Sequence, residues 1–246
     1  AVMGSKNLKA IVVNGDRKTA IADPERTNNA RHDIMRLFKA SPAIFGELGL
    51  AEFGTPALID LITQRRMIPT DNFRRTWFES SSNFSGPAIR RQYEARKDGC
   101  YTCPIQCRKS TLKGLLLPEY NTLSHFGALL GNQDLESIVH ANTLCYEMGL
   151  DPVSTAATLA TWGEIRGRFP EGEEILSLLN DITLKQGAGK LLARGSRQVA
   201  EELGKPTASM TVKSLELPAF DPRGAYGTAL ACAVCNRGGC DQDANP

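Results

Sequence analysis

The sequence predicts a mainly α-helical protein with only short strands. Four segments pair a helix-capping side chain with a proline that suits the first helical position, at Asp23-Pro24, Ser41-Pro42, Thr55-Pro56 and Asp151-Pro152. Over long stretches, apolar residues recur at the period of a helix that is buried on one face. Runs that alternate or are rich in β-branched residues are short and few.

The N-terminal part is expected to combine a strand with a helix. The run from Lys6 to Val13 has a β-branched centre and predicts one strand. After it, Asp23 is expected to cap a helix that begins at Pro24 and carries apolar residues at helical spacing, namely Ala30, Ile34, Leu37 and Phe38.

The middle of the chain predicts three amphipathic helices. Residues 135–148 predict a helix that ends where Gly149 would form the C-cap. Its apolar residues lie on one face and are Ile138, Ala141, Leu144, Cys145 and Met148. Two further stretches, about 173–186 and 189–203, each end at a glycine, Gly187 and Gly204.

The pattern changes after Pro206. Met210 to Leu217 alternates like a strand, residues 218–224 form a loop, and a helix is expected over about 225–236. The polar stretch 79–86 is short enough to be a loop.

Composition excludes several classes of protein. A 41% hydrophobic content over 246 residues is too apolar for a disordered chain, and a net charge of +2 gives no field that would attract nucleic acid or an anionic membrane. No apolar run approaches the ~20 residues that span a bilayer, so we expect a cytoplasmic protein without a membrane partner. Neither end completes a recognisable element, so we expect a piece of a longer protein.

Seven cysteines fall into two groups with Cys145 between them. Their tight clustering and odd number, without a secretion signal, favour metal ligands over disulfides. Cys100, Cys103 and Cys107 have the spacing C-x2-C-x3-C, which lets one loop wrap an iron–sulfur cluster and leaves one iron for a ligand from elsewhere in the fold. A zinc loop, or thiols that pack as small hydrophobic groups, are the alternatives.

The second group, Cys232, Cys235 and Cys240, gives a weaker signal. Cys232 and Cys235 lie in an expected helix among small apolar residues, where buried free cysteine is common. Combined with Cys100 and Cys103 they would make a four-cysteine zinc site. Cys145 lies on an apolar helix face and is expected in the core.

Several segments in order resemble the aldehyde ferredoxin oxidoreductase family. They are Ala1-Val2-Met3-Gly4-Ser5-Lys6-Asn7-Leu8-Lys9-Ala10-Ile11, the loop with Cys100, Cys103 and Cys107, Pro118-Glu119-Tyr120, Gly149-Leu150-Asp151, Leu217-Pro218-Ala219-Phe220-Asp221-Pro222-Arg223-Gly224, and Asn236-Arg237-Gly238-Gly239-Cys240.

The resemblance implies a tungsten or molybdenum ion between two pterins, beside a 4Fe-4S cluster that passes electrons to ferredoxin, with a magnesium ion bridging the pterin phosphates. It implies three parts: residues 1–22 as the tail of a β-rich base domain, 23–209 as the helical middle domain, and 210–246 as the start of the last helical domain. The fourth cluster cysteine would lie beyond residue 246. We therefore expect the isolated chain to be inactive and to hold no stable cluster or other cofactor.

The resemblance also implies roles for single residues. Gly4, Ser5 and Lys6 would contact a cofactor phosphate, with a plain turn as the alternative. In Gly149-Leu150-Asp151, the Asp151 carboxylate would accept N–H bonds from a pterin, or it is simply an N-cap. Glu119 would transfer a proton near the metal, or it is an acid at the start of a helix.

Some positions depart from the family pattern. Asn121 stands where relatives often have a second acid, and Asp241 stands where many relatives have a histidine. Relatives also have an acid that helps to bind pterin near the position of Tyr146. His125 and His140 are expected to be surface or interhelix groups instead.

The reaction that the resemblance implies is the oxidation of a small aldehyde to a carboxylate. Members of the family often form homodimers, so a homodimer is implied as well. The alternatives are a tungsten-dependent aryl-CoA (benzoyl-CoA) reductase subunit of the same superfamily and a non-catalytic helical protein that binds zinc.

Overall fold

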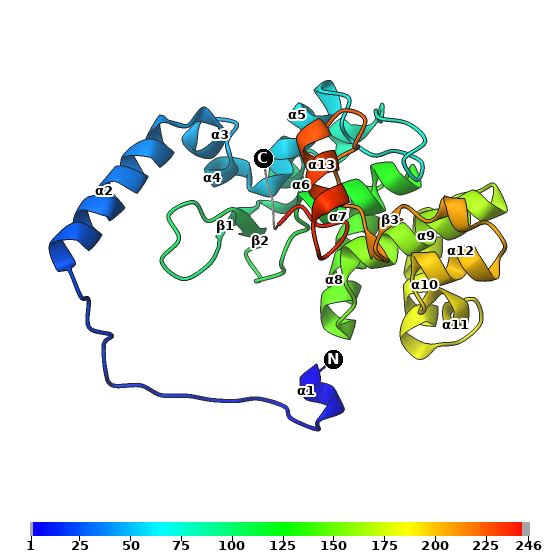
Figure 1. The fold of residues 1–246 in the computed structure, drawn as a ribbon, viewed down its shortest axis with the longest axis horizontal. Coiled ribbons are helices and arrows are strands. Elements are labelled where there is room, and N and C mark those ends of the chain that lie inside the picture. The colour runs from blue at the N-terminus through cyan, green and yellow to red at the C-terminus, as the bar shows by residue number, and fades with distance from the viewer. Residues whose placement is uncertain (1, 243–246) are drawn as a thin grey trace.

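The computed structural model describes residues 2–242 and confirms the predicted mainly helical fold. Figure 1 shows an N-terminal arm that extends away from a helical body. The arm begins with α1 (Val2–Ser5), continues without regular structure over residues 8–21, and leads into α2 (Pro24–Ala40) and α3 (Pro42–Phe45). In the described chain, no helix is long and apolar enough to cross a bilayer.

The strand predicted over Lys6–Val13 is wrong. No segment of residues 2–242 pairs with this run, and Val12 and Val13 are 90% and 89% exposed. A strand on its own leaves its backbone groups without ladder partners and its β-branched side chains without a surface to pack on, so the local preference is not realised.

The predicted helix at Pro24 is confirmed. The Asp23 carboxylate accepts a hydrogen bond of 2.9 Å from the backbone N–H of Arg26, and Pro24 occupies the first turn. None of its side chains is buried: Ile34 is 50% exposed and Leu37 is 67% exposed. The sequence pattern therefore predicted the helix correctly, but the apolar face of this helix is not buried.

The body contains one connected apolar core that draws on residues from Ile59 to Ala219. At its centre α7 (Tyr120–Phe126) and α9 (Pro152–Arg166) pack together, with α8 (Leu135–Met148) beside α10 (Glu173–Leu184). The remaining elements, in chain order, are α4 (Leu50–Phe53), η1 (Thr55–Ala57), α5 (Leu58–Gln64), η2 (Ser81–Phe84), α6 (Gly86–Tyr93), β1 (Arg96–Asp98), β2 (Arg108–Ser110), η3 (Ala128–Leu130), α11 (Gly189–Leu192), α12 (Ser196–Glu202), η4 (Pro206–Ala208), β3 (Thr211–Val212), β4 (Leu215–Glu216) and α13 (Tyr226–Val234).

The helix predicted over 135–148 has the predicted bounds. Asp134 caps its N-terminus, and Gly149 ends it with a left-handed φ of 69°. The backbone N–H of Leu150 then bonds to the carbonyl of Cys145 at 2.8 Å, so orphan carbonyls of the last turn are satisfied.

Three predicted elements differ in the structure. The helix over 189–203 is two helices, α11 and α12, because Gly195 between them has a φ of +89° that a continuous helix cannot contain. The strand over Met210–Leu217 is a tight antiparallel hairpin, β3 and β4, in which Lys213 and Ser214 both have positive φ and reverse the chain. The expected loop at 79–86 contains the short helix η2.

Candidate functional site

The cysteine loop, residues 99–107, connects the two paired strands β1 and β2. The backbone N–H of Cys103 donates to the carbonyl of Cys100 at 3.0 Å, and Thr102 and Gln106 have positive φ values of 62° and 49°. Cys100 is exposed, whereas Cys103 and Cys107 are partly buried. The antiparallel strands hold both ends of the loop, so its three cysteines lie on one short segment between fixed ends.

The cysteine loop is tied to the start of α7 through one residue. The carbonyl of Cys107 accepts from the backbone N–H of Thr55 at 3.1 Å, and the Thr55 hydroxyl accepts from the backbone N–H of Tyr120 at 3.0 Å. Glu119 occupies the N-cap position of α7 without a side-chain capping bond. Thr55 therefore positions the end of the cysteine loop and the predicted proton-transfer carboxylate relative to each other.

Electrostatics are consistent with a shared site. Burial is the main cause that raises the pKa of the Cys107 thiol; the negative charge of Glu119 raises it further, followed by the charges of Cys103 and Cys100. Glu119, Cys103 and Cys100 thus lie within electrostatic range of the Cys107 sulfur. The donor set of the three cysteines, three soft sulfur ligands on one loop, suits a thiolate-held iron group.

Among residues 2–242, no three or more His, Cys, Asp or Glu side chains are gathered into a site for a single metal ion. The four-cysteine zinc site that would combine Cys100 and Cys103 with Cys232 and Cys235 is therefore not assembled in this part of the chain. Cys145 is buried in the core, as predicted, and burial raises its pKa to about 12.

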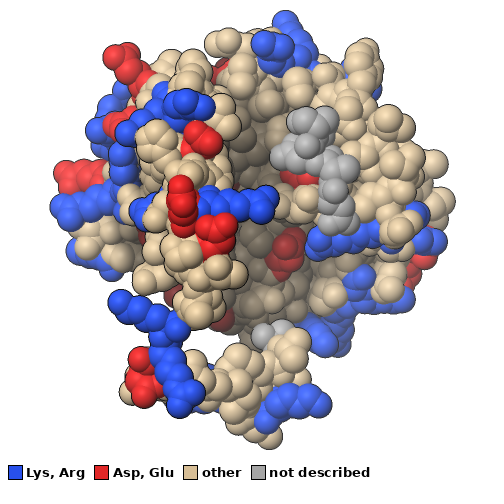
Figure 2. All heavy atoms as spheres, turned by 60° about the vertical axis from the view of Figure 1, so that its left-hand side comes forward, with Lys and Arg blue, Asp and Glu red and all other residues tan. Residues whose placement is uncertain are grey.

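A second feature is a cavity of about 230 Å³ that brings three of the sequence motifs together. Asp151 at the start of α9, Pro218 after β4 and Cys240 of the C-terminal loop represent these motifs, and Asn121 of α7 and Asp241 line the cavity beside them. The tyrosine next to Asn121, Tyr120, donates its hydroxyl to the carbonyl of Ala219 and so connects α7 to the loop after β4. Figure 2 shows a hollowed face of the molecule with acidic side chains in the hollow.

The structure gives Asp151 the role of an N-cap. One of its carboxylate oxygens accepts from the backbone N–H of Ser154 at 2.7 Å, and the residue is otherwise exposed at the cavity. Gly149 and Leu150 form the turn that places it there. The predicted contact between Asp151 and a pterin stays a prediction.

Gly4, Ser5 and Lys6 are not brought to the cysteine loop or the cavity. Gly4 and Ser5 lie in α1, where the Ser5 hydroxyl bonds to the carbonyl of Val2 at 2.8 Å, and Lys6 follows it. An added Cβ on Gly4 would meet nothing within 4 Å. Their predicted phosphate contact stays a prediction.

Two buried polar residues near the cavity were not singled out from the sequence as site residues. His125 is fully buried, with Nδ1 at 2.9 Å from the carbonyl of Asn121 and Nε2 at 3.2 Å from the carbonyl of Leu217, so it is an interhelix group and not a surface one. Burial lowers its pKa. Glu216 accepts from the hydroxyls of Ser154 and Ser196 at 2.8 Å each. No pattern in the sequence around either residue indicates that its side chain is buried.

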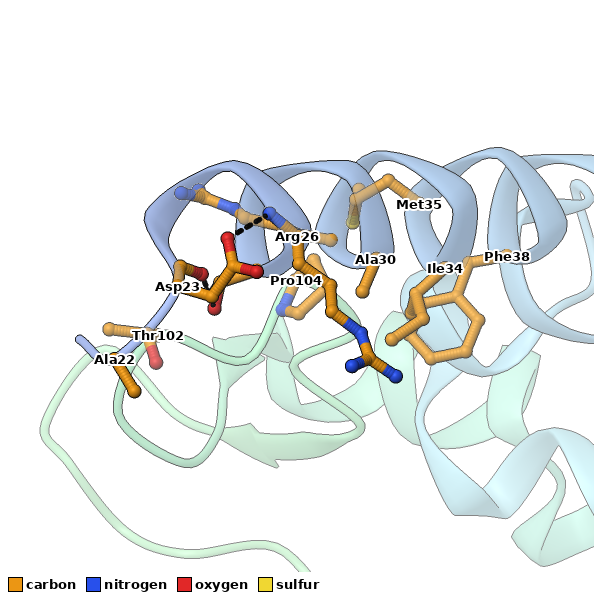
Figure 3. A pocket seen from close by; sticks show the side chains of 11 residues that line it. Ala22, Asp23, Arg26, Ala30, Ile34, Met35, Phe38, Thr102 and Pro104 are labelled. Atoms are coloured by element: carbon orange, nitrogen blue, oxygen red, sulfur yellow. Dashed lines mark hydrogen bonds between the residues drawn. The ribbon is translucent and has the colours of Figure 1, made fainter.

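An apolar groove of about 790 Å³ separates α2 from the cysteine loop. In Figure 3, Ala30, Ile34 and Phe38 of α2 lie on one side, and Thr102 and Pro104 of the loop lie across from the start of the helix. Three of the four apolar residues that the sequence placed on one helix face, Ala30, Ile34 and Phe38, therefore line a groove and are not packed into the core.

Comparison with known proteins gives a consistent result. Residues 29–246 match the family model described as aldehyde ferredoxin oxidoreductase, domains 2 and 3. The chain is 40% identical over 259 residues to the tungsten-containing aldehyde ferredoxin oxidoreductase of Pyrococcus furiosus, and 39% identical to that of Thermococcus kodakarensis. Both matches cover 98% of this chain and 42% of the relative, so the chain spans less than half the length of these relatives.

More distant similarities extend the comparison. The chain is 26% identical over 231 residues to the WOR-like subunit of an aliphatic sulfonate oxidoreductase from Pyrococcus furiosus, which covers 83% of this chain and 36% of that protein. Among solved structures, the active-site complex BamBC of benzoyl coenzyme A reductase matches with a TM-score of 0.70 at 21% identity, over 95% of this chain and 40% of that one. At that identity the match shows the fold alone.

Proposed function

Because the chain belongs to the aldehyde ferredoxin oxidoreductase family, we propose that the whole protein is a tungsten- or molybdenum-pterin enzyme that oxidises an aldehyde to a carboxylate. Two electrons would leave one at a time through a 4Fe-4S cluster to ferredoxin. The described residues would supply the cluster-binding loop and one side of the cofactor cavity. A homodimer and a magnesium ion between the pterin phosphates belong to the same proposal.

The hydrogen bonds of Thr55 are the structural observation that supports this proposal. The hydrogen bonds through Thr55 join the backbone of Cys107 to that of Tyr120, which supports a site in which the end of the thiol loop lies near Glu119. An enzyme that couples proton release to electron removal needs these two functions near each other.

Each residue then has a definite task. The metal pterin, when bound, supplies the oxygen and two-electron chemistry. Cys100, Cys103 and Cys107 would hold three irons of the cluster, and Glu119 would take up a proton released at the substrate. Asp151, whose N-cap bond fixes its carboxylate at the cavity wall, would orient the pterin through its remaining oxygen.

The experiment uses the whole protein, produced without oxygen in medium that contains tungstate or molybdate. We expect about four irons and one tungsten or molybdenum per chain, broad brown absorption, and aldehyde-dependent reduction of ferredoxin. Colourless protein with stoichiometric zinc would contradict the proposal and favour the zinc-binding alternative. Iron and tungsten with turnover of benzoyl-CoA, and not of aldehydes, would favour the aryl-CoA reductase alternative.

A further inference from the structure

Lys109 on β2 is a buried cation, with only 4% of its surface exposed. In the described chain, the other buried residues with formal charge are the acids Glu216 and Asp221. Each acid has matched donors: two serine hydroxyls for Glu216, and the guanidinium of Arg223 at 2.7 Å for Asp221. Lys109 differs from both in its partners.

The ammonium of Lys109 bonds to neutral carbonyls. Nζ donates to the carbonyl of Gln106 at 2.9 Å and to that of Ala51 at 3.3 Å. Nearby Glu52 is already paired with Arg90 and lies 3.9 Å from Nζ of Lys97. Within residues 2–242, no carboxylate lies within 4.0 Å of Lys109.

A buried charge without an opposite charge is expensive, because its desolvation costs several kcal/mol even after relaxation. Proteins keep such a group only where something else repays that cost. An ammonium has three N–H groups, and two carbonyl bonds use only two of them. Among the described residues Lys109 therefore has no carboxylate in direct contact, and Glu52, whose charge reaches it, is already shared with Arg90 and Lys97.

An anion for Lys109 is expected on the cysteine loop. Gln106, whose carbonyl holds the ammonium, directly precedes Cys107 in that loop. An added Cβ on Gly54 would collide with the carbonyl oxygen of Cys107 and lie 3.1 Å from Cγ of Lys109. The backbone at Gly54 therefore packs against the carbonyl of Cys107 and against the aliphatic part of the Lys109 side chain, and keeps the two residues close together.

We propose that Lys109 is the built-in counter-cation of the metal–thiolate group held by Cys100, Cys103 and Cys107, and that its charge raises the reduction potential of this group. The inference rests on the proposed function, since it needs a thiolate-held iron cluster. Reduction adds one electron to a group that is already anionic, so a fixed positive charge in a dry site stabilises the reduced form more than the oxidised form.

The test compares variants of the whole protein, purified without oxygen and loaded with iron. Lys109→Met and Lys109→Gln remove the charge, and Lys109→Arg keeps it. Lys97→Met is a matched control, because Lys97 pairs with Lys109 across the hairpin but its side chain is 54% exposed. Dithionite supplies the electron in a mediated titration, and electron paramagnetic resonance follows the reduced cluster.

We expect both neutral variants to lower the equilibrium constant for reduction about tenfold, which is a shift of about 59 mV to more negative potential for one electron. Lys97→Met should shift it much less, because water and salt screen an exposed charge. Iron should also pass to a chelator faster in the neutral variants than in the wild type, while Lys109→Arg stays close to the wild type.

The outcomes separate this inference from the proposed function. Iron-loaded neutral variants with the wild-type potential would overturn the role of Lys109 and leave the cluster in place. Wild-type protein that takes up no iron would end both. If Lys109→Arg lost iron as readily as the neutral variants, Lys109 would act by packing the loop, and the inference would be overturned. If only the neutral variants lost iron, the inference would be supported.

Discussion

The cysteine loop and the core around Cys145 give the same side chain opposite surroundings. Cys100 is exposed on a loop whose backbone twice adopts positive φ, whereas Cys145 is completely buried on α8. The first environment leaves thiols free to bind a metal, and the second uses a thiol as a small apolar group. The loop cysteines follow one another at short intervals, whereas Cys145 falls at an apolar position of a helical pattern. The exposed and the buried cysteine environments therefore have different patterns in the amino-acid sequence.

The strongest test of this contrast is removal of one sulfur from each region. Cys103→Ser should abolish stable iron binding by the whole protein, because a hard hydroxyl is a poor substitute for a thiolate ligand. Its fold should persist, because Cys103 is only partly buried. Iron content and far-ultraviolet circular dichroism measure the two effects.

Cys145→Ser is the matched control for that experiment. It should keep its iron and lose about 1–3 kcal/mol of stability, because a hydroxyl replaces a thiol at a fully buried position. If Cys145→Ser lost iron while Cys103→Ser kept it, the assignment of the two regions would be reversed.

Thiol labelling sharpens the same contrast without mutation. Burial raises the pKa of Cys145 to about 12 from the ordinary value of 9.0. At pH 8 this lowers the thiolate fraction about 1,000-fold relative to an ordinary thiol, and the thiolate is the reactive form. In metal-free native protein, iodoacetamide should therefore label Cys100 and spare Cys145, as peptide mass spectrometry would report.

Denaturant provides the control for labelling. In guanidinium chloride all seven cysteines should react, because unfolding removes the burial that suppresses Cys145. Rapid labelling of Cys145 in the native protein would show that α8 opens on the timescale of the reaction and would contradict a rigid core around this thiol.

A glycine substitution tests how firmly the cysteine loop is anchored to the body. Gly54 has φ 73° and ψ −168°, a region that is almost restricted to glycine, and its missing Cβ makes room for the carbonyl of Cys107. Gly54→Ala should cost about 1–3 kcal/mol for backbone strain and more for displacing the loop. Urea unfolding measures the change in the free energy of unfolding.

Gly114→Ala separates the strain from the collision. Gly114 has a φ of 80°, but an added Cβ would meet nothing within 4 Å. It should therefore show a strain cost alone and be less destabilising than Gly54→Ala. Equal costs at the two positions would mean that the contact between Gly54 and Cys107 contributes nothing to stability.

Local signals explain most of what could be predicted from the sequence. Asp23, Asp151 and Gly149 act at helix ends through bonds within a few residues, so their effect is encoded locally and the structure confirms it. The strand at Lys6–Val13 failed because a strand depends on a partner that the sequence pattern cannot supply. The break at Gly195 was missed because an apolar stripe can continue across a turn.

The candidate site divides in the same way. The three loop cysteines share one segment, so their spacing predicts that they lie near one another, and the structure places all three between β1 and β2. The bonds that join Thr55 to Cys107 and Tyr120 bridge residues far apart in the sequence, and the burial of Lys109 depends on the approach of Ala51. Such long-range contacts leave no periodic signal in a single sequence, so only the structure could supply them.

The smallest expected effect concerns pH and the buried His125 of the core. Burial lowers its pKa below the value of 6.5 expected in the unfolded chain, although the nearby charges of Asp151 and Glu216 oppose this. Below pH 6.5 the unfolded chain takes up a proton that the folded protein resists. The contribution of His125 to stability is therefore fully present above pH 6.5 and is lost as the pH falls through its lower, folded pKa.

Urea unfolding at pH 7.5 and pH 5.5 would measure this loss in the wild type and in His125→Gln, which cannot be protonated. The variant should lose less stability between the two pH values than the wild type, and His140→Gln, at an exposed position on α8, should behave like the wild type. Both ring nitrogens of His125 face carbonyl oxygens, and a neutral ring has one N–H, so only one of these bonds is a donor bond. If His125→Gln and the wild type lost the same stability, burial would leave the pKa of His125 at its unfolded value, whereas a smaller loss in the wild type than in the variant would mean that the second carbonyl stabilises the protonated ring.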